Sequence, residues 1–133
     1  MRVDHFAFLV SNMNNSIEFY KEKLGFHFLS VEVDKEHGEK FAFFKLDNAS
    51  LELLEKLSVK DPSIFEKSDA SRRGYCPHVA INCDDLDKIV EFLDERDVKI
   101  VGGPFEIKNQ VKWLYISDPD GNIIEFVEWL REQ

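Results

Sequence analysis

The feature that most constrains the fold of this chain is an internal repeat with an offset of 73 residues. Residues 124–128, Ile-Glu-Phe-Val-Glu, align with residues 51–55, Leu-Glu-Leu-Leu-Glu, and the alignment extends upstream to His78 on His5 with no gap. A repeat of this length predicts two copies of one structural module, because each copy buries its apolar face against neighbouring structure. At 133 residues the chain has the length of one domain.

In the first copy, short runs of β-forming residues predict strands, and apolar residues at helical spacing predict one helix. Ser11-Asn12 suits the start of that helix and Gly25 its end. The expected elements are a strand at 2–10, a helix from 13 to 24, and strands at 26–33, 40–46 and 50–56.

The second copy repeats this order. Its expected elements are a strand at 75–83, a helix from about 85 to 96, strands at 98–101, 111–117 and 122–128, and loops at 102–104 and 108–110. We therefore expect an α+β fold in which each module has a sheet with one face covered by a helix and one open face. The predicted single domain, 1–133, consists of module 1 (1–57), a linker (58–74) and module 2 (75–133).

Each copy carries a histidine near its start and a glutamate near its end. These are His5 and Glu52 in module 1, and His78 and Glu125 in module 2. Side chains alternate between faces along a strand, so each pair is expected to face inward among apolar neighbours. A pseudo-twofold axis would bring all four together. Two imidazoles and two carboxylates suit one divalent ion, namely Zn, Ni, Co, Mn or Fe, with coordination positions left open for a substrate.

A single histidine or glutamate on a strand is more often a structural or solvated residue than a ligand. The recurrence of both residue types at equivalent positions favours the metal site. In each copy an alanine also stands two residues after the histidine, at Ala7 and Ala80, and leaves room beside the imidazole. His27 and His37 have no counterpart in the repeat and are interpreted as surface residues. The phenylalanines are interpreted mainly as core residues, with some available to line a pocket.

The charge balance limits the class of partner. The formal net charge is −9, from 26 acidic and 17 basic residues. Dispersed cations in such an acidic chain disfavour nucleic acid and anionic membranes, which need clustered Lys and Arg. No apolar run reaches the length of a membrane span, and residues 1–10 do not resemble a signal peptide. We expect a cytoplasmic protein that acts on a small molecule, with Cys76 and Cys83 as buried thiols that form no disulfide with each other.

Several of these segments together resemble the vicinal oxygen chelate superfamily, which includes glyoxalases, bleomycin resistance proteins and dioxygenases. The resemblance covers nearly the whole chain and is greatest to glyoxalase I (lactoylglutathione lyase). The segments that carry it are Asp4-His5-Phe6, Ser16-Ile17-Glu18-Phe19-Tyr20, Leu24-Gly25-Phe26, Leu51-Glu52-Leu53-Leu54, His78-Val79-Ala80 and Asp118-Pro119-Asp120-Gly121-Asn122-Ile123-Ile124-Glu125.

The resemblance implies paired βαβββ modules around one divalent metal ion, usually in a homodimer. It places His5, Glu52, His78 and Glu125 in the ligand positions. It also implies a lyase or isomerase that moves a proton beside the carbonyl of a small hemithioacetal-like substrate, with Glu125 as the catalytic base and Glu52 opposite it. The substrate-binding residues are not identified.

Two alternatives to glyoxalase I remain open. Leu9 and Lys56 stand where glyoxalase I commonly has an arginine and an asparagine that bind glutathione. The thiol cosubstrate of this protein is therefore not assigned. Methylmalonyl-CoA epimerase is the near rival, because residues 51–57 and the turn Glu36-His37-Gly38 resemble its corresponding segments. The second alternative is a small-molecule-binding or resistance protein on the same scaffold, which would not need four intact ligands.

Overall fold

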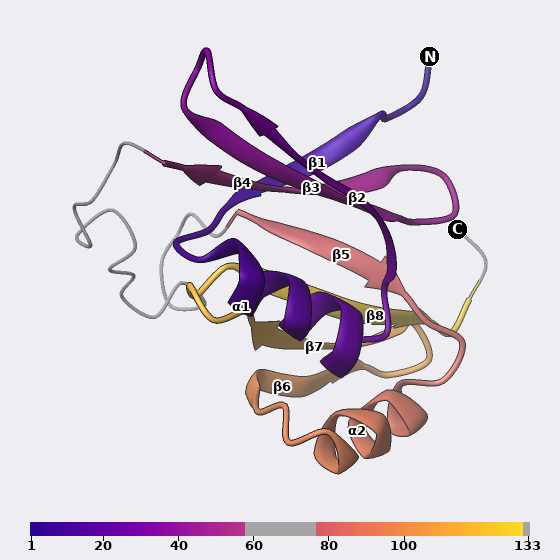
Figure 1. Ribbon diagram of the computed structural model, residues 1–133. Coiled ribbons are helices and arrows are strands. Elements are labelled where there is room, and N and C mark those ends of the chain that lie inside the picture. The colour runs from indigo at the N-terminus through magenta and orange to yellow at the C-terminus, as the bar shows by residue number, and fades with distance from the viewer. Residues whose placement is uncertain (58–76, 132–133) are drawn as a thin grey trace. The chain divides into compact units, whose positions relative to one another are not determined.

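The computed structural model describes residues 1–57 and 77–131 (Figure 1). The chain divides into two compact units, Met1–Glu66 and Lys67–Gln133, called here the first and second units. The expected linker, 58–74, and Cys76 lie outside the described residues. No helix in the described parts is long and apolar enough to cross a membrane.

The first unit has the predicted order of strand, helix and three strands. Its elements are β1 (His5–Leu9), α1 (Met13–Glu18), a π-helical turn η1 (Phe19–Lys23), β2 (His27–Asp34), β3 (Glu39–Lys45) and β4 (Ser50–Lys56). The strands form one sheet in the order β1-β4-β3-β2, in which β1 and β4 run parallel and the other neighbours antiparallel. The first and last strands of the module therefore lie side by side in the sheet.

The second unit repeats this topology. Its elements are β5 (His78–Asn82), α2 (Leu86–Glu95), β6 (Ile100–Ile107), β7 (Val111–Ser117) and β8 (Ile123–Trp129). The sheet order is β5-β8-β7-β6, again with a parallel pair, β5 and β8, formed by the first and last strands. The predicted α+β fold of two βαβββ modules is confirmed.

The gap-free offset of 73 is wrong for one strand of the repeat. β3 and β7 begin at Glu39 and Val111, an offset of 72. The turn at 108–110 is one residue shorter than the turn at 35–38, and the loop at 118–122 is one residue longer than the loop at 46–49. The two length changes compensate, so the first and last strands of each module keep the 73-residue offset on which the His/Glu pairs depend.

The expected loop at 102–104 is also wrong, because these residues lie inside β6. The register of β6 against β7 shifts on both sides of Gly102. A Cβ at Gly102 would lie 3.1 Å from Cδ2 of Tyr115, and Gly103 has a φ of +87°, a region that favours glycine. β6 is an edge strand, where Pro104 breaks no interior hydrogen-bond ladder. Gly and Pro here mark bulges within a strand.

The predicted helix of the first unit is confirmed, but its second half, η1, is π-helical rather than α-helical. The Asn12 side chain accepts a hydrogen bond from the backbone N–H of Asn15 and caps the helix. After α1 the chain widens into the π-helical turn, where the Leu24 N–H donates to the Phe19 carbonyl. Gly25 follows with a φ of +72° and ends the helix.

The core of each unit lies on the side of the sheet that faces the helix. In the first unit this side is built from Tyr20, Ala42, Phe44, Leu51 and Leu53, all fully buried. In the second unit the equivalent side includes Leu86, Leu93, Leu114, Ile116, Ile124 and Phe126. Alternation along the strands directs Glu52 and Glu125 to the opposite, open side of their sheets.

A second repeated glutamate pair, Glu55 and Glu128, lies on the helix-facing side. Each lies three residues beyond Glu52 or Glu125 on the same strand, so alternation directs it to the opposite face. The Glu55 carboxylate accepts a hydrogen bond from the N–H of Met13 at 3.2 Å. In the second unit the Glu128 carboxylate accepts from the N–H of Leu86 at 2.7 Å. Met13 and Leu86 are the first residues of α1 and α2, so each glutamate satisfies a free donor at the positive end of a helix.

Replacing Glu128 with alanine is expected to lower the free energy of unfolding by about 1–2 kcal/mol, because the Leu86 N–H loses a charged acceptor. Urea denaturation of wild type and variant measures the change. Glu128→Gln, which keeps an acceptor oxygen, is expected to lose less. Equal stability of wild type and Glu128→Ala would show that water replaces the carboxylate at no cost.

Candidate metal centre

In the first unit, His5 and Glu52 lie together on the open side of the sheet. Their strands, β1 and β4, are parallel neighbours, and Ala7 is the register partner of Glu52. The His5 Nε2 lies 3.7 Å from Oε2 of Glu52. The two side chains are 40% and 18% exposed, so both remain accessible to a ligand from solvent.

The second unit holds the same arrangement. His78 on β5 and Glu125 on β8 lie on neighbouring parallel strands, with Ala80 as the register partner of Glu125. The His78 Nε2 lies 3.7 Å from Oε1 of Glu125, and the side chains are 32% and 15% exposed. The structure thus brings each predicted pair together, with the same separation in both units.

This separation fits two ligands of one cation. A gap of 3.7 Å is too long for a hydrogen bond between imidazole nitrogen and carboxylate oxygen. Two metal–ligand bonds of about 2.1 Å each span such a gap. The alanine beside each glutamate, Ala7 or Ala80, leaves the space through which the carboxylate reaches its histidine. The donors are a nitrogen and an oxygen, a set that Zn and neighbouring divalent ions accept.

A further carboxylate orients the first histidine. The Asp4 Oδ2 lies 2.7 Å from Nδ1 of His5, which leaves Nε2 directed at Glu52. This hydrogen bond is the largest cause that raises the pKa of the His5 imidazole, the Glu52 charge adds to it, and partial burial opposes it. Sequence reasoning assigned no role to Asp4. Asp4 could have been identified from its position next to a candidate metal-binding histidine. Such histidines commonly donate a hydrogen bond to a carboxylate through their other ring nitrogen.

Aromatic rings lie beside both pairs. Phe43, the register partner of Glu52, makes an edge contact with His5 at 6.1 Å between ring centroids. Tyr115, the register partner of Glu125, contacts His78 in the same way at 5.8 Å. Phe43 lies outside the core and is partly exposed on the open side of its sheet, as the sequence allows for some of the phenylalanines. These rings form apolar walls beside the candidate ligands.

The remaining candidates lie elsewhere. His27 and His37 are exposed, as predicted, and the Nδ1 of His37 is 2.7 Å from a carboxylate oxygen of Asp34. Within residues 1–57 and 77–131, no group of three or more His, Cys, Asp and Glu side chains is close enough to hold one metal ion. Each unit supplies two donors, and the four-residue set remains a prediction.

Comparison with known proteins identifies the family. The model of the Glyoxalase/Bleomycin resistance protein/Dioxygenase superfamily matches residues 2–126, which include all four candidate ligands. The chain belongs to this superfamily. The family resemblance stated from the sequence is thereby confirmed.

Relatives of this superfamily member differ in activity. It is 30% identical to the mitochondrial methylmalonyl-CoA epimerase of Bos taurus, over 93% of this chain and 72% of the relative. It is similar in structure to TnmS3, an antibiotic-binding protein from Streptomyces, with 27% identity, a TM-score of 0.72, and coverage of 97% and 96% of the two chains. A trypanothione-dependent glyoxalase I of Leishmania major shares 25% identity and a TM-score of 0.71, with coverage of 96% and 86%. The superfamily therefore includes enzymes and binding proteins at similar distances from this chain.

Proposed function

We propose that this superfamily member is a divalent-metal-dependent lyase or isomerase of the glyoxalase I type. Its substrate would be a small hemithioacetal-like molecule, and its reaction the transfer of a proton between carbons beside the carbonyl. The observation that carries the proposal is the repeated pair: the same histidine and glutamate, on equivalent strands, separated by 3.7 Å in both units.

The four side chains would divide the work as follows. His5, Glu52, His78 and Glu125 would hold the ion, drawn together either within one chain or from two chains of a dimer. A bound divalent ion supplies Lewis acidity, which makes a C–H beside a carbonyl easier to deprotonate. Glu125 would take the proton from one carbon and return it to the next, with Glu52 opposite it. Phe43 and Tyr115 would exclude water beside the carboxylates.

Neither His/Glu pair is sufficient to hold a divalent ion by itself. Two donors from one unit leave most coordination positions of a divalent ion unfilled. We therefore propose that both units act as one functional domain. We also propose that the protein is a homodimer, as the family resemblance implies, and that it acts in the cytoplasm on a small molecule.

Methylmalonyl-CoA epimerase activity is the second candidate, favoured by the 30% identity to a protein of that name. In that interpretation Glu36, in the turn between β2 and β3, would be a catalytic base. This turn lies at the far end of β4, where the Leu57 N–H donates to the Gly38 carbonyl. At about 3.3 Å per residue, that end is more than about 13 Å from Glu52 along the strand. Glu125 lies in the pair itself, which favours the glyoxalase type.

The epimerase interpretation has its own test. We would measure α-proton exchange on an acyl-CoA and hemithioacetal turnover. If Glu36→Gln abolishes the exchange and the wild type does not turn over hemithioacetals, the epimerase function replaces the glyoxalase function.

Elemental analysis tests the metal site. After equal exposure to divalent ions, we expect about one equivalent of metal for each four-residue site in the wild type and less than about a tenth of that in Glu52→Ala. Glu55→Ala is the matched control, since Glu55 lies on the same strand but faces the helix, and its metal content should be unchanged. No metal in the wild type would overturn the enzyme proposal and leave a small-molecule-binding protein.

A further inference from the structure

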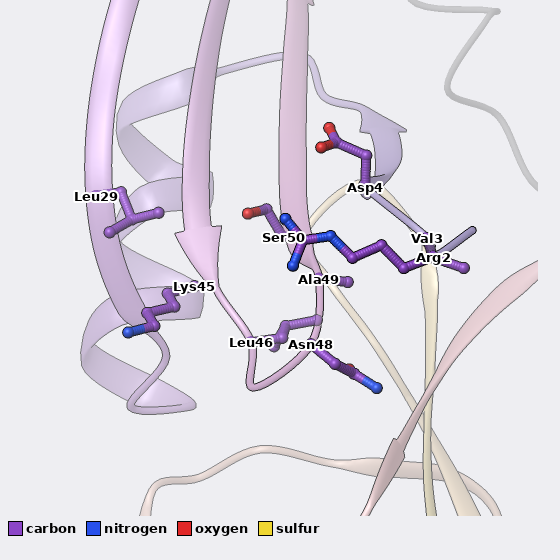
Figure 2. Close-up of a pocket in the computed structure, with 9 residues that line it drawn as sticks. All are labelled: Arg2, Val3, Asp4, Leu29, Lys45, Leu46, Asn48, Ala49 and Ser50. Atoms are coloured by element: carbon purple, nitrogen blue, oxygen red, sulfur yellow. The ribbon is translucent and has the colours of Figure 1, made fainter.

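A cavity opens at the start of β4 in the first unit, beside the His5/Glu52 pair. Its volume is about 290 Å³, enough for a small anionic group rather than a whole cofactor. Figure 2 shows the Arg2 side chain extending across the start of β4, with its guanidinium beside Ser50. Lys45 and Leu29 line the cavity from β3 and β2.

Neither His5 nor Glu52 lines the cavity, but the sheet register relates the cavity to the candidate metal centre. Ser50 is the register partner of His5 on one side and of Lys45 on the other. Directly paired residues point to the same face, so these three side chains form one row on the open side of the sheet. With strands about 4.8 Å apart, the ends of this row are about 10 Å apart. An anionic group held at Ser50 would therefore lie one strand from His5, and a substrate would have to span about 10 Å to reach His5 from Lys45.

The charges that line the cavity favour an anion. Among the described residues, neither Arg2 nor Lys45 has an ion pair or a hydrogen bond to another side chain. The carboxylate that also lines the cavity, Asp4, is bonded to the His5 ring, and Figure 2 shows it directed away from Arg2. Two unpaired cations at one cavity are notable in a chain with a formal net charge of −9.

We propose that Arg2, Lys45 and Ser50 form an anion subsite that binds a carboxylate or phosphate group of the substrate. The guanidinium, the ammonium and the hydroxyl supply the donors that such oxygens accept. Leu29, which is 48% exposed, forms an apolar side of the cavity. The substrate class is thereby a small carbonyl compound with an acidic group. This use of the subsite rests on the proposed function, whereas anion binding itself does not.

The test is an NMR titration of the full chain without metal, with inorganic phosphate and succinate in separate arms. We expect saturable shifts of the Ser50 and Asn48 amides with at least one of the two anions. The dissociation constant should rise at least about tenfold in the double variant Arg2→Gln/Lys45→Gln, because charge-assisted hydrogen bonds are lost. Lys99→Gln, an exposed cation of the second unit, is the control and should bind as the wild type does.

The two proposals fail separately. The absence of saturable shifts with both anions, or an unchanged dissociation constant in the double variant, would overturn the subsite even if the protein binds metal and turns over substrate. Saturable binding that depends on Arg2 and Lys45, in a protein that takes up no metal, would support the subsite and contradict the proposed function. Charge-retaining Arg2→Lys/Lys45→Arg is expected to keep binding within a few fold, which separates lost charge from lost structure.

Discussion

Glu125→Gln is expected to lower kcat for hemithioacetal isomerisation by about 10²–10⁴-fold, the range for loss of a general base. The amide has nearly the same size as the carboxylate and keeps an oxygen that can ligate a cation, but it does not accept a proton at neutral pH. Single-turnover kinetics on metal-loaded protein, together with elemental analysis of the same sample, would separate loss of proton transfer from loss of metal.

The matched control is Glu128→Gln on the same strand. Glu128 lies three residues beyond Glu125 on the opposite face and accepts from the Leu86 N–H, so its replacement should affect stability and leave kcat within about twofold. Near wild-type turnover in Glu125→Gln, with metal retained, would exclude Glu125 as the base and direct attention to Glu52, the equivalent residue of the first unit.

Phe44→Ala is expected to lower the free energy of unfolding by about 3–5 kcal/mol, a large fraction of the stability of an ordinary domain. The Phe44 ring is fully buried on the helix-facing side of β3. It contacts the rings of Tyr20 and Phe28, with centroid separations of 5.7 and 5.6 Å. Removing the ring leaves a cavity that the surrounding side chains fill only in part. Urea denaturation followed by circular dichroism measures the loss.

Phe43, the neighbour of Phe44 on β3, provides a control that tests which face of the sheet is buried. Phe43→Ala removes a ring of the same size from the opposite, open side of β3, where the side chain is only partly buried. Its expected cost is about 1 kcal/mol. Its larger effect should be on substrate turnover, because the ring contacts His5. Equal destabilisation by the two variants would contradict the assignment of the two faces of the sheet.

The sequence determined the architecture of this protein to a large extent. The repeat predicted two modules, and within each the alternation of apolar residues predicted which face is covered. The alternation is a local signal, because a strand period of two and a helical spacing need only neighbouring residues, and the repeat is found by aligning the chain with itself. The same alternation placed each histidine and its glutamate on one face, and the parallel pairing of the first and last strands brought the two side chains together.

Other features depended on contacts between distant strands. Gly102-Gly103-Pro104 has the composition of a loop, and only its pairing with β7 makes it a bulged edge strand. The 72-residue offset between β3 and β7 is likewise visible only in the register, since a shorter turn and a longer loop cancel in the sequence.

The proposed role of Arg2 and Lys45, which are not part of the repeat, could be recognised only from the tertiary structure. No sequence signal connects Arg2 with Lys45, which are 43 residues apart and share no motif. The pairing of β1 with β4 and of β4 with β3 places them around one cavity next to His5. Sequence periodicity therefore determined which face each candidate ligand occupies, whereas long-range strand pairing decided which neighbours surround it.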